Sequence, residues 1–428
     1  MDSWSLRRSF LTSLLATAAT ALLSLALPAQ GPPPGMSAEE WARRLKRGLQ
    51  DYTKVEKAAK PRSLLFLGGT GFLGPHTVQY AVARGHTVTL FNRGNRNEAL
   101  FPELEELRGD RDPKVGDGLK SLEQAIAAGR KWDAVIDTSG YVPRIVSAAA
   151  ELLKPATKQY VFVSSISVYA DARPSGITEA AAVATIADPA NEDVGANYGA
   201  LKALCEQAAE KAFPGRTTNV RPGYIVGAKD ATNRFAYWPA RAAKGGKVLA
   251  PPRADPIQFL DVRDLAEFLV HCTENETMGV FNAVGPDRVL TMGELLDACS
   301  AATGNKAEFV CVDGDFLAAR EANGLPIWTQ PGSDFGGFGA IANRKAIAAG
   351  LKFRSVNDTV QATWDWWSGI SEAAKAAMWD SARNGRPTPE QEAEVIAAWL
   401  ARAKDGGEKG GDKVGKDERG EGRGKRDR

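Results

Sequence analysis

The chain has few of the residues that usually bind metal ions. It contains only three histidines and four cysteines, with no HExxH sequence and no CxxC pair. Structural and catalytic zinc sites usually combine such ligands at short spacing, so the sequence predicts no metal site. We expect the thiols to be buried, and a disulfide between Cys299 and Cys311 is the alternative in an oxidising compartment. The other two cysteines are Cys205 and Cys272.

A strong excess of charge is also lacking. The 54 lysine and arginine residues nearly balance the 52 acidic residues, and the formal net charge is +2. Surfaces that bind nucleic acid usually carry clustered basic residues interleaved with aromatic ones. No such cluster stands out, so we expect a small-molecule partner and no nucleic acid.

Long apolar runs are absent after the first thirty residues. Before that point, Arg7 and Arg8 precede an apolar run that ends in small residues near Ala29. This is the layout of a secretory signal, and the arginine pair resembles a twin-arginine signal for exporting folded proteins. We expect residues 1–29 to be removed and the mature protein to reach the periplasm or the extracellular space without a membrane segment. An uncleaved membrane anchor is the alternative.

The remainder predicts an α/β fold. Residues 37–61, with Ser37 as helix cap, predict an amphipathic helix after a linker. From Arg62 onward, short apolar runs such as SLLFLGG and QYVFVSSISVY alternate with helical stretches. Strands that are apolar on both faces predict a Rossmann-type doubly wound parallel sheet covered by helices.

The chain order suggests a smaller second part beside this sheet. We expect two helices after the last strand of that part and a disordered, charged end. The predicted divisions are a Rossmann domain at 62–225 with 257–285 returning to it, a substrate-binding subdomain at 226–256 and 286–355, helices at 356–404, and the tail at 405–428.

Three glycines follow the first predicted strand. Gly68 would allow a tight turn, Gly71 would let the backbone approach a pyrophosphate, and Gly74 would let the next helix pack closely. The backbone amides near Phe72 and Leu73 would then meet the phosphate charge. The segment predicts an NAD(P) site, and a tight turn without a ligand is the alternative.

The end of the second predicted strand bears on which cofactor binds. Asn92 and Arg93 stand where an acidic residue usually selects the unphosphorylated ribose. An arginine can accommodate a 2′-phosphate, so these residues favour NADP slightly, unless Arg93 is simply solvated. Further on, Asp110 is a candidate acceptor for the adenine amino group.

A tyrosine and a lysine in the sequence NYGALK are the strongest catalytic candidates. On a helix, Tyr198 and Lys202 would lie one turn apart on the same face. A nearby ammonium group favours the ionised form of a phenol. A half-exposed helix, with a packed tyrosine and a solvated lysine, is the plain alternative. The strand before this helix brings Ser164, Ser165 and Ser167 to its carboxyl end, where α/β sheets bind ligands.

Together these motifs resemble the extended branch of the short-chain dehydrogenase/reductase superfamily, the NAD-dependent epimerase/dehydratase family. The resemblance covers about residues 62–355, in the family's order, with GxxGxxG, SSISVY, YGALK, RPGYIVG, QFLDVRDLA and GVFNAVG. It implies that Tyr198 is the general acid/base, and that Lys202 holds the nicotinamide ribose and lowers the pKa of the tyrosine. Ser165 would hydrogen-bond the substrate oxygen, with Ser167 as its competitor.

The chain also departs from that family. IDTSGY stands in place of a His-Ala-Ala segment, and Ile166 and Ser167 replace the Asp-Glu pair of the dehydratases, which disfavours dehydration. The segment after RPGYIVG lies where relatives build the substrate pocket. Its candidate sugar or phosphate contacts, with plain packing as an equal alternative, are Arg234, Tyr237, Trp238 and Arg241.

Three functions remain open at this stage. The first is a redox-neutral epimerase of a sugar or nucleotide sugar, the second a net reductase or dehydrogenase, and the third a non-catalytic NAD(P)- or RNA-binding relative. Export favours the first, because little free nucleotide should be available outside the cytoplasm and a tightly bound cofactor must be regenerated on each turnover. The resemblance also makes a homodimer a reasonable expectation.

Overall fold

The structure is a computed structural model, and it describes residues 37, 46–94, 100–379 and 386–407. The predicted signal at 1–29, the linker and most of the predicted tail lie outside the described residues. The helix predicted over residues 37–61 is wrong in its second half. The chain turns directly after Lys46, and Gly48 has a φ of +85°, which side chains rarely adopt. A Cβ atom at Gly48 would also lie 2.6 Å from the ring of Trp366.

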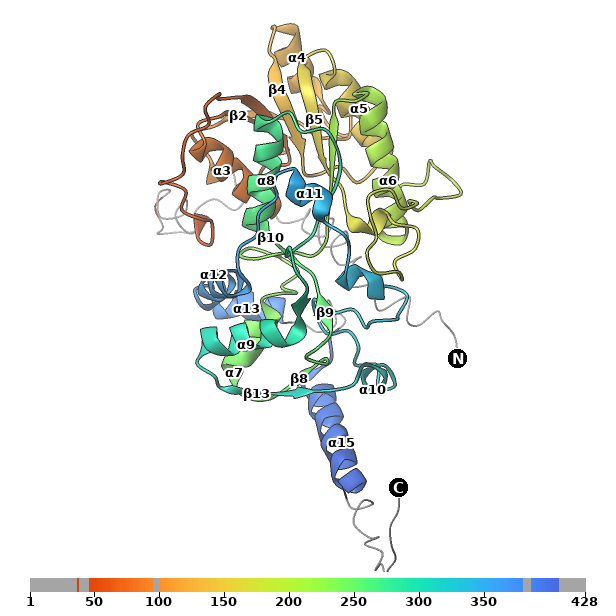
Figure 1. Ribbon diagram of the computed structural model, residues 1–428. Helices are drawn as coiled ribbons and strands as arrows, with labels where there is room; N and C mark the ends of the chain where they lie inside the picture. The colour runs from red at the N-terminus through yellow and green to blue at the C-terminus, as the bar shows by residue number, and fades with distance from the viewer. Residues whose placement is uncertain (1–36, 38–45, 95–99, 380–385, 408–428) are drawn as a thin grey trace, which may run out of the picture.

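A seven-stranded, fully parallel sheet forms the upper part of the molecule in Figure 1. Its strand order is β11-β6-β5-β4-β1-β2-β3. This arrangement confirms the predicted Rossmann-type α/β fold. Strand β3 was not among the predicted strands, because its glutamates and half-exposed residues hide the apolar pattern. The strands are β1 (Ser63–Leu67), β2 (Thr87–Asn92), β3 (Glu105–Arg108), β4 (Trp132–Asp137), β5 (Thr157–Val163), β6 (Thr217–Pro222) and β11 (Gly279–Ala283).

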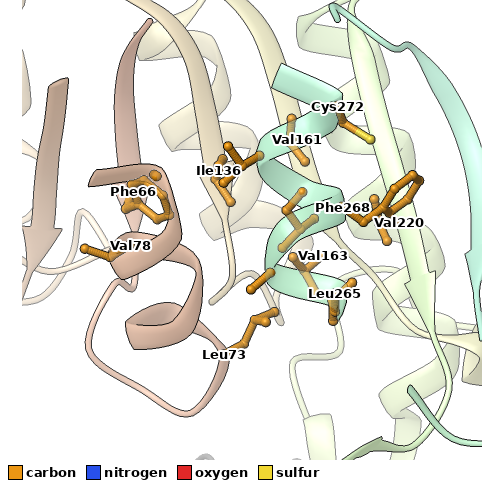
Figure 2. Close-up of a cluster of buried hydrophobic side chains, with 14 of the residues drawn as sticks. Phe66, Leu73, Val78, Ile136, Val161, Val163, Val220, Leu265, Phe268 and Cys272 are labelled. Carbon is orange, nitrogen blue, oxygen red and sulfur yellow. The ribbon is translucent and has the colours of Figure 1, made fainter. Parts of the chain in front are cut away.

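Helices cover both faces of this sheet. On one face, α3 (Leu73–Ala83) and α8 (Val262–Glu274) pack against β1, β4, β5 and β6. Figure 2 shows Leu265 and Phe268 of α8 beside Val163 and Val220 of the sheet. The opposite face packs against α4 (Lys120–Ala127), α5 (Pro143–Leu153) and α6 (Val194–Ala212). Each fully buried aliphatic or aromatic side chain of these layers contributes about 1.5–3 kcal/mol.

A second core lies below the sheet in Figure 1. It is built around the parallel pair β8 (Gly246–Ala250) and β13 (Ala307–Cys311). Four helices pack there: α7 (Tyr237–Lys244), α9 (Met292–Thr303), α12 (Val356–Ser368) and α15 (Pro389–Gly407). The domain boundaries given above remain a prediction.

Several shorter elements complete the described fold. They are η3 (Ile166–Val168), β7 (Ile225–Val226), β9 (Pro256–Ile257), β10 (Leu260–Asp261), β12 (Leu290–Thr291), α10 (Gly314–Ala318), η4 (Gly336–Gly339) and α11 (Arg344–Ala348). The chain between α12 and α15 forms a further helix, α13 (Glu372–Met378), capped by Ser371. The described part of 356–404 therefore holds three helices where two were predicted. Helix α15 also continues through residues 405–407, which were predicted to be disordered.

The four cysteines are all unpaired thiols, and three of them are buried. The alternative of a Cys299–Cys311 disulfide is therefore wrong for this structure. Among the described residues, no group of three or more His, Cys, Asp or Glu side chains could hold a metal ion. In the same part of the chain, no helix combines the length and apolar character needed to cross a bilayer.

Candidate functional site

The glycine turn joins β1 to α3 at the carboxyl edge of the sheet. Gly68 adopts a φ of +96°, which a side chain would strain. A Cβ atom at Gly74 would lie 2.6 Å from the carbonyl oxygen of Gly68, so the close approach of helix and turn requires glycine there. A Cβ atom at Gly71, in contrast, would meet nothing within 4 Å. The backbone of Gly71 thus borders open space on the side where a side chain would lie.

The first turn of α3 faces this space with its backbone. Phe72 is the N-cap residue and provides no side-chain hydrogen bond to the helix amides, and Leu73 follows as the first helical residue. Unsatisfied N-terminal amides and the helix dipole attract phosphate groups. The open position at Gly71 and these amides fit the pyrophosphate of a dinucleotide.

The end of β2 differs from its prediction. The Asn92 side chain is buried and donates to Glu106 Oε1 at 3.2 Å, while Arg93 is exposed. Glu106 lies on β3, the neighbouring strand, and was missed because β3 itself was not recognised. A carboxylate here would repel a phosphate group bound beside it. Asp110 accepts the backbone N–H of Asp112 at 2.8 Å and stabilises a turn.

Ser165 and Ser167 lie together where β5 ends. Ser165 is buried and caps η3, accepting the backbone N–H of Ser167 at 3.1 Å. The two hydroxyl oxygens are also 3.1 Å apart and share a hydrogen bond. The Ser164 hydroxyl is buried and has no hydrogen-bond partner among the described residues. Both candidate serines therefore reach one place at the carboxyl edge of the sheet.

Tyr198 begins the regular part of α6. The residue before it, Asn197, has non-helical dihedral angles (φ −127°, ψ 26°), so the helix kinks immediately ahead of the tyrosine. Gly199 follows, and a Cβ atom there would come within 2.0 Å of the Ser167 carbonyl oxygen. Only a glycine lets α6 pack so closely against η3. This contact places Tyr198 close enough to Ser165 for the serine hydroxyl to affect the pKa of the phenol.

The pKa of Tyr198 is raised above its ordinary value, mainly because the phenol is removed from water. A hydrogen bond with Ser165 and the positive charge of Arg234 oppose this shift. The resemblance gives the role of lowering this pKa to Lys202, and that role remains a prediction.

Lys202, one helical turn after Tyr198, is almost fully buried. Its Nζ donates to the carbonyl oxygens of Gly140 at 2.7 Å and Val163 at 2.6 Å. Burial lowers the pKa of Lys202 to about 8. An ammonium group has three donors, so one remains for a ligand beside the two carbonyl contacts. The residue fits the predicted hold on a ribose hydroxyl.

The loop after β7 brings one predicted substrate residue to the site. Arg234 lies over the ring of Tyr224, 5.0 Å from its centroid, and its charge acts on Tyr198. The same loop buries Asp230 and Asn233, which the sequence analysis missed. Asp230 Oδ2 and Asn233 Oδ1 lack hydrogen-bond partners among the described residues, and Asn233 has a φ of +51°. Strained loops with buried polar atoms are common at ligand sites.

The other three substrate candidates belong to the second core. Trp238 is fully buried and donates its indole N–H to the carbonyl of Pro326 at 2.9 Å. Tyr237 is buried against Trp379. Arg241 pairs with Glu392 at 3.1 Å and so fastens α15 to α7. Trp238 thus packs inside the second core, whereas Tyr237 and Arg241 line a cavity beside α15, and their role as substrate contacts remains a prediction.

Comparisons with known proteins agree with this geometry. A family model described as "NAD dependent epimerase/dehydratase family" matches residues 64–283. The chloroplast stem-loop binding protein of 41 kDa b of Arabidopsis thaliana is 28% identical over 264 residues, covering 58% of this chain and 65% of that protein. A UDP-glucose 4-epimerase of Neisseria meningitidis serogroup B is 28% identical over 166 residues, covering 34% of this chain and 47% of that enzyme. Each of these two matches spans less than two thirds of the relative's length.

A solved structure shares the fold. The UDP-glucose 4-epimerase of Thermus thermophilus, in complex with NAD, superposes with a TM-score of 0.51 at 18% identity and covers 72% of this chain and 100% of that one. The relatives of known structure thus include NAD complexes, and nothing in them supports the predicted preference for NADP. On the family model, which matches half of the chain, this protein belongs to the NAD-dependent epimerase/dehydratase family.

Proposed function

We propose that the protein is an NAD-dependent epimerase, or a closely related isomerase, of a sugar or nucleotide sugar. The observation that carries the proposal is the placement of Ser165 at the end of β5, next to helix α6 with Tyr198 and, one helical turn further on, the buried Lys202, which donates to the Val163 carbonyl oxygen of the same strand. The three side chains converge at the carboxyl ends of the central strands, where open α/β sheets bind ligands. The relatives named as UDP-glucose 4-epimerases support the substrate class.

Tyr198 would move the proton of a substrate hydroxyl group. Bound NAD would supply the acceptor for the hydride on the same carbon and could return it to either face. Ser165 would hold the substrate oxygen beside the phenol, and Lys202 would donate its remaining N–H to the cofactor ribose. The buried Ile166 cannot take part in proton transfer where dehydratases place an acid. The site therefore favours epimerisation over loss of water.

NAD is the cofactor that the adenosine side of the site favours. The Glu106 carboxylate beside Asn92 can accept the hydroxyl groups of an unmodified ribose. The same carboxylate would face a 2′-phosphate with a like charge, at a cost that the exposed Arg93 offsets only partly.

The predicted export of the folded protein would require a tightly bound cofactor, because little free nucleotide should be available outside the cytoplasm. The predicted twin-arginine signal at residues 1–29 would deliver the chain after it has folded and bound NAD. An enzyme that takes a hydride from its substrate and returns it needs no cofactor exchange outside the cytoplasm. This argument favours the epimerase over a net reductase.

RNA binding is a second candidate, because one relative is named a stem-loop binding protein. The near balance of basic and acidic residues gives it less support than the convergent polar site gives the epimerase. An RNA-binding chain would also have no need of a serine, a tyrosine and a buried lysine placed together at the carboxyl edge of the sheet.

Turnover of a panel of UDP-sugars and free sugars, followed by NMR of the products, tests the proposal. We expect at least one substrate to be inverted without net change in NADH, and both Tyr198→Phe and Lys202→Met to abolish the reaction. Tyr80→Phe, on the far end of α3, is the matched control and should be active. Steady accumulation of NADH would support a net dehydrogenase instead. Tight RNA stem-loop binding that Tyr198→Phe leaves intact, with no turnover, would support the second candidate.

A further inference from the structure

Two side chains, Arg111 of the segment RGDRD and Asp137 of the segment IDTSGY, have no role in the site described above. The structure joins them through a largely buried ion pair. Arg111 donates to Asp137 through two bonds, Nη1 to Oδ1 at 2.6 Å and Nη2 to Oδ2 at 2.8 Å. The Asp137 side chain is fully buried, and Tyr160 donates its hydroxyl to Oδ2 at 2.7 Å. Both carboxylate oxygens are therefore saturated by fixed donors.

The Arg111–Asp137 ion pair links two distant positions at the carboxyl edge of the sheet. Arg111 follows β3, at one edge of the sheet, whereas Asp137 ends β4, on the far side of β2 and β1. Arg111 also donates to Ser139 Oγ at 3.0 Å, and the Ser139 N–H donates to Asp137 Oδ1 at 3.0 Å. Thr138 then donates to the Gly68 carbonyl oxygen at 2.9 Å. The first half of the β4–α5 loop, residues 138–142, is thus fixed against the glycine turn.

The second half of this loop contacts the ammonium group of Lys202. Gly140 supplies one of the two carbonyl oxygens that hold Lys202 Nζ. Tyr141 places its ring centroid 5.1 Å from that Nζ and 6.5 Å from the ring centroid of Tyr198. Any displacement of the loop would therefore move the acceptor of Lys202 and the ring beside Tyr198 at the same time.

Stability alone does not explain such a pair. Removing two charges from water costs about as much as their attraction returns, and apolar replacements of buried ion pairs are often neutral or stabilising. The bidentate geometry, however, fixes position and orientation closely. On the basis of the proposed function, we propose that Arg111 and Asp137 are positioning residues, which hold the β4–α5 loop so that Lys202 and Tyr141 are fixed beside Tyr198.

The electrostatics provide a measurable signature of this arrangement. Burial lowers the pKa of Lys202 to about 8, and the groups that face it modify that value. Cys205 and Glu206 of its own helix and Asp137 of β4 raise the pKa, whereas Arg111 lowers it. Removing the carboxylate and removing the guanidinium should therefore move the titration of Lys202 in opposite directions.

The test is an NMR titration of the full mature chain without nucleotide, with lysine labelled at 13Cε and the signal assigned by Lys202→Met. Asp137→Asn keeps the shape of the side chain and should lower the titration midpoint by about one pH unit. Arg111→Gln should raise it and remains informative if the first variant fails to fold. Arg144→Gln is the matched control, because Arg144 of α5 forms a bidentate pair with Asp112 of the same post-β3 loop on the half-exposed surface. Its midpoint should equal that of the wild type.

A second measurement separates positioning from charge alone. NAD titration of Asp137→Asn at a pH below both midpoints should show weaker binding than the wild type, while Arg144→Gln binds normally. Unchanged midpoints in both site variants, or unchanged NAD affinity in a folded Asp137→Asn protein, would overturn the inference. Failure of the wild type to bind NAD would instead overturn the proposed function. The titration without nucleotide would still show whether Asp137 and Arg111 shift the pKa of Lys202.

Discussion

Gly199 and Ser167 are in backbone contact, such that a Cβ atom on the glycine would lie 2.0 Å from the serine carbonyl oxygen. Gly199→Ala should therefore push η3 away from α6 and separate Ser165 from Tyr198. We expect a loss of about 1–3 kcal/mol in the free energy of unfolding, as for other overpacked contacts, together with a fall in kcat. Denaturant unfolding and steady-state kinetics measure the two effects.

Gly195→Ala on the same helix is the control for that variant. A Cβ atom there would approach only Asp193 Oδ1, the N-cap acceptor of α6, at 3.1 Å, and a shift of a few tenths of an ångström relieves this contact. Its kcat and stability should be close to those of the wild type. Equal activity of the Gly199 and Gly195 variants would show that the contact does not position the serines.

Two glycines of the turn should respond differently to alanine. Gly71→Ala places its methyl group in open space, so stability should change by less than about 0.5 kcal/mol, while NAD affinity falls about tenfold or more. Gly74→Ala would collide with the backbone of Gly68 and Gly69 and should destabilise the whole domain. Thermal unfolding and isothermal titration with NAD distinguish the two. Undiminished NAD binding by Gly71→Ala would place the pyrophosphate elsewhere.

The positive charge of Arg234 should set the pH at which Tyr198 acts as a base. The charge lowers the pKa of Tyr198, so Arg234→Met should raise that pKa and move the acidic limb of the pH–rate profile to higher pH. Ser165→Ala should move the limb in the same direction, because its hydrogen bond also lowers the pKa. Arg173→Met, on an exposed pair with Asp171, should leave the limb in place. A limb unmoved by Arg234→Met would mean that another group titrates.

The predicted export route can be checked in the source cell. Replacing Arg7 and Arg8 by lysines should retain the full-length chain in the cytoplasm, because twin-arginine addresses depend on that pair. Cell fractionation and the mass of the exported protein measure both transport and cleavage after Ala29. Export of the lysine variant at the normal level would rule out this route.

The fold was largely predictable because its signals are local. Apolar strands alternating with helices predicted the parallel sheet, and the glycine spacing predicted the turn before α3. Strand β3 was missed because its half-exposed glutamates carry no apolar pattern. The helix predicted over residues 37–61 does not continue past Lys46, where Gly48 adopts a φ of +85° close to Trp366. Such long-range contacts leave no periodic trace in the sequence.

The site was predictable where function fixes residue spacing. Ser165, Tyr198 and Lys202 converge as expected, because a strand end and one helical turn define their positions. Trp238 was assigned to the substrate pocket, since sequence does not show which way α7 faces. The Arg111–Asp137 pair was not foreseen, because it joins segments that only the strand order brings together.

The cofactor content of the mature protein tests the central claim most directly. Protein purified without added nucleotide should release NAD on denaturation, or bind it tightly when it is added, and Tyr198→Phe should do so equally well while losing turnover. Chromatography and absorbance identify the released nucleotide. A folded chain that neither retains nor binds nicotinamide nucleotide, or a Tyr198→Phe protein with undiminished turnover, would contradict the account.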